Sequence, residues 1–200
     1  MCGINGMFHL QAQKKVDERI LTKMRDSLQH RGPDDKGIFI DRNIGLGHRR
    51  LSILDVSAAG HQPFFSDNGR FVLTYNGEIY NYKEFYSELT RNGFNIKTNS
   101  DTEVLIKLFE LHGLKMLHRL NGMFAFAIWD KLEKKLTIVR DRMGVKPLYY
   151  TFNDDTFYFA SEQKALFTAG IPLKIAQQGL EEYIFNRFVA GKNTLYQNIH

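Results

Sequence analysis

The stretch GMFAFAIWDKLEKKLTIVRD, residues 122–141, decides the fold class of this chain. Its first part, residues 122–130, and its last part, residues 134–141, are typical of buried strands, because aromatic, β-branched and small apolar residues dominate both. The polar residues 131–134 between them are typical of a turn. Alternating aromatic residues and alanines in the first strand indicate a core position. The stretch therefore predicts two neighbouring buried strands joined by a tight connection.

Outward from this pair, further strand-like runs come in groups separated by Gly, Asn and Asp. They cover residues 3–10, 36–40, 44–54, 70–80, 146–152 and 156–162. Helical patterns cover residues 16–34, 82–93, 100–113, 162–170 and 177–188. In the first of these helices Asp17 is a start signal and Gly32-Pro33 is the stop. Because strands and helices are segregated, the pattern predicts an α+β layered fold of antiparallel sheets with covering helices.

The helix predicted over residues 100–113 has a clear N-terminal signal. Ser100 or Asp101 is suited to cap it, since short polar side chains accept hydrogen bonds from the first free N–H groups. Glu103 is placed to complete a capping box with Ser100.

The composition describes an ordinary globular chain. Its 200 residues suffice for one sizeable domain, and a net charge of +5 without any Lys/Arg-rich run argues against a nucleic-acid partner. One cysteine excludes an internal disulfide and a multi-cysteine metal site. No apolar stretch is long enough to span a membrane and no secretory signal is visible, so we expect a cytoplasmic protein.

The single cysteine, Cys2, directly follows Met1. A small second residue permits removal of Met1, after which Cys2 carries both a thiol and a free α-amine. An ordinary α-amine has a pKa of roughly 7.7–8.0, so a useful fraction is neutral near pH 7. That amine can take the thiol proton and later return it to a leaving amine. The position therefore predicts a nucleophile that carries its own base, although a small residue near a terminus is an equally ordinary explanation.

Other residues suit an acyl-transfer site that acts on an amino acid. The Asn76 amide and the Gly77 N–H are candidate donors to a developing oxyanion. Arg50 is suited to a bidentate grip on a carboxylate, and Asp101 can pair with an ammonium. Each has a plainer interpretation as well: Asn-Gly is often a turn at a strand end, Asp101 a helix cap, and Arg50 a surface charge.

The order and spacing of several motifs carry a family resemblance over nearly the whole chain. The chain resembles the glutaminase domain of class II (N-terminal nucleophile) glutamine amidotransferases, specifically that of glutamine-hydrolysing asparagine synthetases. The motifs are MCGI, HRGPD, HRRLSI, GHQPF, YNGEIYNY, SDTEVL, GMFAFAIWD, RDRMGVKPLYY and ASEQKAL.

The resemblance implies a four-layer αββα sandwich and a set of roles. Cys2 would form a γ-glutamyl thioester, and Asn76 with Gly77 would form the oxyanion hole. The substrate glutamine would be held by Arg50 at its α-carboxylate, by Asp101 at its α-ammonium with Glu78 nearby, and by backbone groups of Leu51 and Ile53. No metal or cofactor is implied in this domain. One departure is Asn5, which stands where the family's opening strand has an apolar residue.

A second departure concerns the partner domain. The family's synthetase domain activates aspartate with ATP and Mg through a Ser-Gly-Gly loop, and no SGG occurs here. We expect residues 1–200 to be the glutaminase domain, with residues 175–200 leading into a synthetase domain supplied in cis or in trans. Glutamine and that domain are the expected partners, and a homodimer is possible.

Two other functions stay open on the sequence. The chain could be a non-catalytic interaction or regulatory domain of the same fold whose site is ordered only by a partner. A self-processing peptidase of the same nucleophile class is disfavoured, because Arg50 and Asp101 suit a free amino acid.

Overall fold

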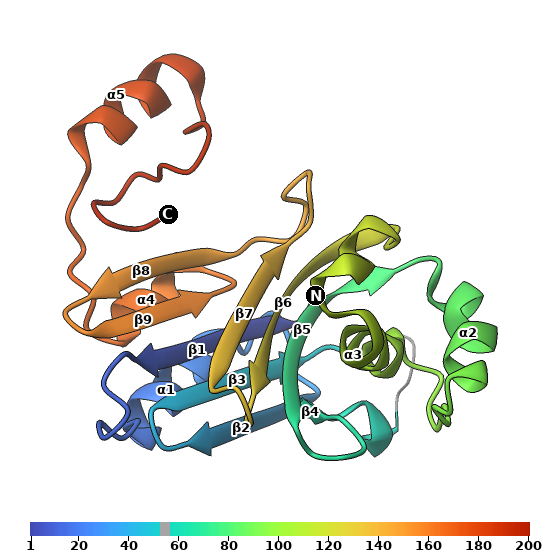
Figure 1. Cartoon of the computed structure of the whole chain (residues 1–200). Coiled ribbons are helices and arrows are strands. Elements are labelled where there is room, and N and C mark those ends of the chain that lie inside the picture. The colour runs from blue at the N-terminus through green and yellow to red at the C-terminus, as the bar shows by residue number, and fades with distance from the viewer. Residues whose placement is uncertain (53–56) are drawn as a thin grey trace.

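The computed structural model describes residues 1–52 and 57–200, which form two antiparallel sheets (Figure 1). The first sheet has the strand order β2-β3-β1-β9-β8. Its strands are β1 (Gly3–His9), β2 (Asp35–Asp41), β3 (Ile44–Arg50), β8 (Tyr149–Asn153) and β9 (Thr156–Ala160). The second sheet has the order β4-β5-β6-β7. Its strands are β4 (Phe64–Phe65), β5 (Phe71–Ile79), β6 (Gly122–Asp130) and β7 (Lys135–Arg140).

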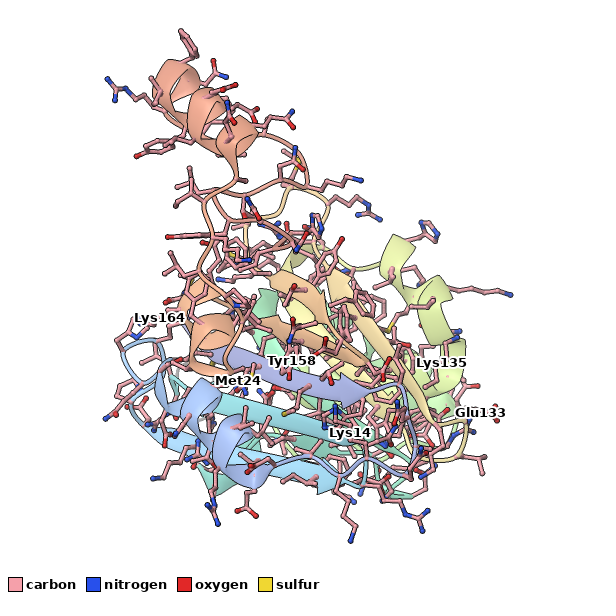
Figure 2. The ribbon with its side chains drawn as sticks, turned by 90° about the vertical axis from the view of Figure 1, so that its left-hand side faces the viewer. Lys14, Met24, Glu133, Lys135, Tyr158 and Lys164 are labelled. Carbon is pink, nitrogen blue, oxygen red and sulfur yellow. The ribbon has the colours of Figure 1, made fainter. Side chains whose placement is uncertain are left out.

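Helices cover the outer face of each sheet. Helices α1 (Glu18–Asp26) and α4 (Gln163–Thr168) pack on the first sheet, with Met24 and Tyr158 in one cluster (Figure 2). Helices α2 (Tyr86–Arg91) and α3 (Asp101–His112) pack on the second sheet. Short 3₁₀ helices are η1 (Ala58–Gly60), η2 (Tyr82–Phe85) and η3 (Gly113–His118), and α5 (Gln177–Asn186) is the last helix.

The apolar core has the three parts that four layers require. One cluster fills the space between the sheets, and its members include Ile4, Leu46, Val72, Trp129 and Phe159. The other two lie between a sheet and its helices. The predicted four-layer αββα sandwich of the α+β class is therefore confirmed.

The hairpin predicted at residues 122–141 is present as β6 and β7, with Phe126 opposite Val139. The alternation in β6 has a physical cause. Phe124 and Phe126 face the helices, whereas Ala125 and Ala127 face the other sheet. Each fully buried Phe contributes roughly 1.5–3 kcal/mol.

The N-terminal strand β1 lies in the middle of its sheet, between β3 and β9. The unexpected Asn5 is fully buried there, and its Nδ2 donates to the Leu21 carbonyl at 3.3 Å. Gly47 lies directly opposite on β3, and a Cβ at that position would come within 2.4 Å of the Asn5 Oδ1. The glycine thus provides the room that a polar side chain needs at a place where we expected an apolar one.

Helix α1 begins as predicted but ends early. Its cap Asp17 accepts a hydrogen bond from the Arg19 N–H at 2.8 Å. The helix stops at Asp26 rather than at Gly32, because the Ser27 hydroxyl donates to the Met24 carbonyl at 2.7 Å and the chain tightens into turns. The prediction over residues 82–93 also changes, since that segment starts as the 3₁₀ helix η2 before α2.

Helix α3 confirms one cap and corrects another. The Ser100 hydroxyl accepts from the Thr102 N–H at 3.2 Å, as expected of a cap. The predicted capping box is wrong, because the Ser100 N–H donates to the Thr98 hydroxyl instead. The buried Glu103 carboxylate reaches further back and accepts from the Thr98 N–H at 2.7 Å, so it ties the preceding loop to the helix.

The C-terminal segment with α5 projects from the sandwich (Figure 1). Its side chains Phe185 and Phe188 are 84% and 61% exposed. The segment returns to the body at its end, where the His200 N–H donates to the Tyr150 carbonyl at 3.0 Å. Among the described residues, no helix has the length and apolar character that crossing a membrane requires.

Candidate functional site

The cysteine Cys2 lies immediately before β1, beside the residue that follows β3. Its Sγ accepts from the Leu51 N–H at 3.4 Å and donates to the Leu51 carbonyl at 3.7 Å. The Cys2 carbonyl accepts from the Arg31 Nε–H at 2.9 Å. Burial raises the pKa of the Cys2 thiol. The thiol is thus anchored on both sides, but it needs a base to become a thiolate at neutral pH.

Cys2 opens into a cavity of about 170 Å³ where the two sheets meet α3. Every predicted site residue that the structure describes lines it: Cys2, Arg50, Leu51, Asn76, Gly77, Glu78 and Asp101. Ile53 lies outside the described residues. Residues up to a hundred positions apart in the sequence are therefore brought to one small volume.

A fully buried histidine connects the two sheets next to this cavity. Burial lowers the pKa of His48 to about 3, so the imidazole is neutral. Its Nε2–H donates to the Tyr75 carbonyl at 3.0 Å, from β3 to β5. His48 lies two residues before Arg50 in β3, and Tyr75 lies one residue before Asn76 in β5. The hydrogen bond thus joins the two strands close to these site residues.

Asn76 and Gly77 lie within β5, opposite Ala125 and Phe124 of β6. The plainer interpretation of this pair as a turn at a strand end is wrong, because the ladder continues to Ile79. Gly77 is required by packing, since a Cβ there would lie 2.5 Å from the Met123 carbonyl oxygen.

The Asn76 amide carries an unused donor. The side chain is 1% exposed, and its Nδ2 has no hydrogen-bond partner within residues 1–52 and 57–200. A buried donor without an acceptor costs about 1–3 kcal/mol. An oxygen atom bound in the cavity would remove that cost.

The guanidinium of Arg50, the last residue of β3, lies beside Ser57 and Gly60. Its Nη1 donates to the Ser57 carbonyl at 2.7 Å. A Cβ on Gly60 would lie only 2.0 Å from the Arg50 Nη2. A positive charge is therefore held at the wall of the cavity by these contacts.

The carboxylate of Asp101, at the start of α3, also lines the cavity. Its Oδ2 accepts from the Tyr75 hydroxyl at 2.6 Å and from the Ile79 N–H at 2.9 Å. Burial raises the pKa of Asp101, and burial also raises the pKa of Tyr75 well above its ordinary value. The buried carboxylate is suited to a cationic ligand, because such a ligand would offset its loss of solvation.

The first residue, Met1, also lines the cavity. Its Sδ lies 3.2 Å from the Lys146 Nζ, and burial lowers the pKa of its α-amine. The predicted base, the amine of Cys2 itself, exists only once Met1 has been removed.

Several lining residues were not predicted. They are Gly60, Gln62, Tyr75, Ser100, Thr102, Met123 and Lys146. Tyr75 and Gln62 act through contacts that the sequence does not display, since the Gln62 Oε1 accepts from the Tyr75 N–H at 2.7 Å. Lys146 lies in the motif RDRMGVKPLYY, which could have signalled it.

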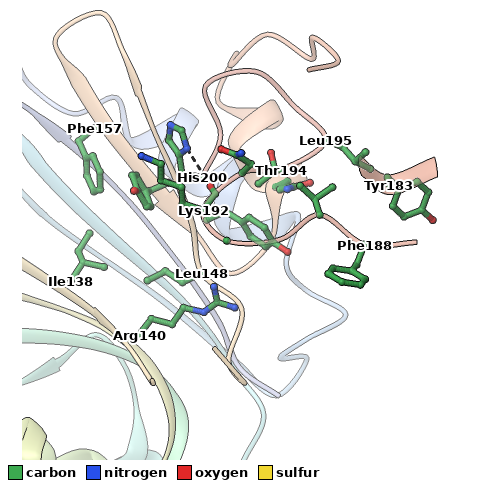
Figure 3. Close-up of a pocket in the computed structure, with 16 residues that line it drawn as sticks. Ile138, Arg140, Leu148, Phe157, Tyr183, Phe188, Lys192, Thr194, Leu195 and His200 are labelled. Atoms are coloured by element: carbon green, nitrogen blue, oxygen red, sulfur yellow. Dashed lines mark hydrogen bonds between the residues drawn. The ribbon is translucent and has the colours of Figure 1, made fainter. Parts of the chain in front are cut away.

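A larger cavity of about 820 Å³ lies between the C-terminal segment and β7, β8 and β9 (Figure 3). The His200 Nδ1–H donates there to the Lys192 carbonyl at 3.2 Å. Its described lining contains no thiol and no carboxylate side chain. The smaller cavity at Cys2 is therefore the candidate active site.

Comparison with known proteins agrees with this geometry. A solved structure of glutamine phosphoribosylpyrophosphate amidotransferase from Bacillus subtilis matches with a TM-score of 0.72 and 25% identity, over 84% of this chain and 44% of that chain. The fold is thus that of the N-terminal nucleophile amidotransferases. The family model of the glutamine amidotransferase domain matches residues 1–200, and the chain belongs to that family.

Its relatives by sequence include asparagine synthetases. The glutamine-hydrolysing asparagine synthetase 1 of Bacillus subtilis is 42% identical over 98% of this chain and 31% of its own length. A putative asparagine synthetase of Methanocaldococcus jannaschii is 38% identical over 99% of this chain and 42% of its own length. The chain thus spans less than half the length of these curated relatives. The predicted resemblance to the amidotransferase domain of asparagine synthetases is confirmed.

Proposed function

We propose that this domain hydrolyses glutamine to glutamate and ammonia, with Cys2 as the nucleophile. The observation that carries the proposal is the cavity at Cys2, which combines a thiol, an unused amide donor, a cation and a carboxylate. These groups match the γ-amide, the α-carboxylate and the α-ammonium of a free glutamine.

Binding uses the two charged side chains, Arg50 and Asp101, that line the cavity. The Arg50 guanidinium pairs with the α-carboxylate, and Asp101 pairs with the α-ammonium. Glu78 adds negative charge near Asp101, and Leu51 lines the pocket, whereas the role of the Ile53 backbone stays a prediction. The side-chain amide of the substrate then points toward the Cys2 Sγ.

The chemical steps balance with the α-amine of the processed Cys2 as base. The amine takes the thiol proton, and the thiolate attacks the amide carbon. The Asn76 Nδ2–H and the Gly77 N–H donate to the oxyanion. Collapse breaks the C–N bond, and the amine returns its proton to the leaving ammonia. Water then attacks the thioester, and glutamate leaves as the thiol reforms.

The similarity to glutamine-hydrolysing asparagine synthetases supports a destination for the ammonia. We infer that it passes to an ATP-dependent domain that converts aspartate to asparagine, in cis or in trans. ATP and Mg belong to that domain, and no cofactor or metal is assigned to this one. A cytoplasmic location, a homodimer and the absence of nucleic-acid binding stay predictions.

The test uses protein whose loss of Met1 is verified by mass spectrometry. Glutamate release from glutamine is expected for the processed chain and is expected to vanish in Cys2→Ala, whose small second residue still permits Met1 removal. A chain with one extra residue before Cys2 should also be inactive, because its amine is locked in a peptide bond. Unchanged turnover in Cys2→Ala would refute the mechanism.

Calorimetry with glutamine separates the remaining alternative. The proposal predicts that Cys2→Ala still binds glutamine, because Arg50 and Asp101 are intact. No binding at millimolar glutamine by the processed wild type would favour a non-catalytic domain.

A further inference from the structure

The side chain of Lys146 is an unusual feature of the cavity at Cys2. It is only 5% exposed, it lines the cavity, and its Nζ contacts the Met1 Sδ at 3.2 Å. Within the described part of the chain it forms no ion pair with a carboxylate. Burying an ammonium without a counter-charge is costly, which argues for a use in the site.

The loop that carries Lys146 is held rigidly. Asp141 accepts from the N–H groups of Val145 and Lys146, each at 2.9 Å. Arg140 donates to the Gly144 and Lys146 carbonyls at 2.7 and 2.8 Å, and Figure 3 shows Arg140 at the edge of the larger cavity. Hydrogen bonds thus hold the loop backbone at Gly144, Val145 and Lys146, and from this backbone the Lys146 side chain lines the cavity.

Other charged side chains near Cys2 have polar partners of their own. Arg31, which holds the Cys2 carbonyl, forms an ion pair with Glu162 at 2.9 Å. Arg50 donates to the Ser57 carbonyl, and Asp101 accepts from the Tyr75 hydroxyl and the Ile79 N–H. Among residues 1–52 and 57–200, the charged and titratable groups near Cys2 and the N-terminus are Arg31, Asp34, Arg50, Tyr75, Glu78, Asp101 and Lys146.

We propose that the Lys146 ammonium keeps the α-amine of the processed Cys2 in its neutral, proton-accepting form. This inference rests on the proposed function and adds a residue to it. Loss of Met1 removes the thioether contact and leaves the Lys146 ammonium in the same small cavity that Cys2 lines with its new N-terminus. A nearby cation disfavours a second positive charge. Lys146 acts through the amine, so it is a positioning residue and not a catalytic one.

The α-amine of Met1 shows the same kind of influence from Lys146. Burial is the largest reason that the pKa of the Met1 α-amine lies below its ordinary value, and Arg31 and Lys146 lower it further. The Cys2 side chain, whose effect is second only to burial, and Asp34 both raise this pKa.

The experiment uses the fact that the chain has one cysteine. Labelling with ¹³C-cysteine gives one Cα signal, which reports the amine, and one Cβ signal, which reports the thiol. Processed wild type, Lys146→Met, Lys146→Arg and the exposed control Lys15→Met are titrated by NMR. Lys146→Met should raise the pH midpoint of the Cys2 Cα titration by roughly 0.5–1 pH unit. Lys146→Arg and Lys15→Met should match the wild type.

A kinetic readout accompanies the titration. The fall of kcat/KM at acidic pH reports the coupled titration of the Cys2 amine and thiol. Loss of the Lys146 cation should raise the pKa values of both groups. Activity of Lys146→Met near pH 6.5 should therefore fall about three- to tenfold and recover at high pH. A merely structural role would lower activity at every pH.

The outcomes separate the two proposals. A folded Lys146→Met with an unchanged Cα midpoint overturns the role of Lys146, whatever its activity. A processed wild type that cannot hydrolyse glutamine overturns the proposed function, and the NMR titration still decides the inference. If Lys146→Met does not fold, Lys146→Gln takes its place, with the same expected midpoint.

Discussion

The Tyr75 hydroxyl donates to the Asp101 Oδ2 at 2.6 Å, and this bond joins β5 of the second sheet to the first residue of α3. Tyr75 directly precedes Asn76 in the strand. One side chain thus connects the strand that carries the proposed oxyanion donors with the proposed ammonium ligand. The arrangement makes Asp101 part of the site geometry as well as of the helix start.

Tyr75→Phe should weaken glutamine binding without slowing the chemical step. The ring still fills its buried place, but Asp101 loses one of its donors, which is worth about 1 kcal/mol. KM should therefore rise roughly three- to tenfold while kcat stays near the wild-type value. Steady-state kinetics checks this, with the exposed Tyr80→Phe as control. A loss confined to kcat would show that Tyr75 acts on the reacting atoms instead.

Asn76→Ala should lower kcat and leave KM nearly unchanged, the reverse of the effect expected for Tyr75→Phe. Removal of one oxyanion donor typically lowers kcat by about 10²–10³. KM should change little, because the donor meets the oxygen chiefly in the transition state. The exposed Asn95→Ala is a matched control and should keep full activity. Since the Asn76 Nδ2 has no partner in the described structure, the variant should also be no less stable to urea.

The elements that the sequence predicted correctly depend on local patterns. The strands at residues 122–130 and 135–140 carry their own turn and alternation, and Ser100 caps α3 through a contact two residues away. Such signals lie within a few residues of each other. The wrongly predicted capping box shows their limit, because the Glu103 carboxylate accepts from Thr98, a partner that only the folded loop provides.

The site depended on information that is not local. No pattern near Cys2 indicates that β1 lies between β3 and β9. The pair Asn76–Gly77 resembled a turn, but pairing with β6 keeps it in a strand. The family resemblance supplied what periodicity could not, whereas Tyr75 and Lys146 became visible only through their tertiary contacts.

Gly60→Ala should damage the carboxylate site without direct contact with the substrate. The new Cβ would lie 2.0 Å from the Arg50 Nη2, and a flexible side chain yields more readily than backbone. Displacement of the guanidinium should raise KM about tenfold, as expected for a lost charged hydrogen bond.

Gly77→Ala is the contrasting control for that variant. There the Cβ meets backbone, at 2.5 Å from the Met123 oxygen and 2.8 Å from the Phe124 Cα. This overpacking should cost about 1–3 kcal/mol of unfolding free energy. Thermal unfolding should therefore separate the two, with a clear fall in Tm for Gly77→Ala only. An equal fall in both would contradict the explanation for Gly60.

His48 should make the fold sensitive to mild acid. Its pKa is lowered by burial to about 3 in the folded state, against an ordinary value of 6.5. The unfolded chain therefore binds a proton that the folded chain does not between these values. Stability from this group is present above pH 6.5 and is lost as the pH falls toward 3. The unfolding free energy should fall by about 1.4 kcal/mol for each pH unit in that window.

Urea unfolding at pH 7, 6 and 5 tests this dependence. His48→Gln keeps an amide donor for the Tyr75 carbonyl but removes the titration, so its unfolding free energy should change less steeply with pH. The exposed His118→Gln should retain the wild-type slope. If the slopes of wild type and His48→Gln coincide, the histidine does not control acid stability, and the link between β3 and β5 must be maintained by other contacts.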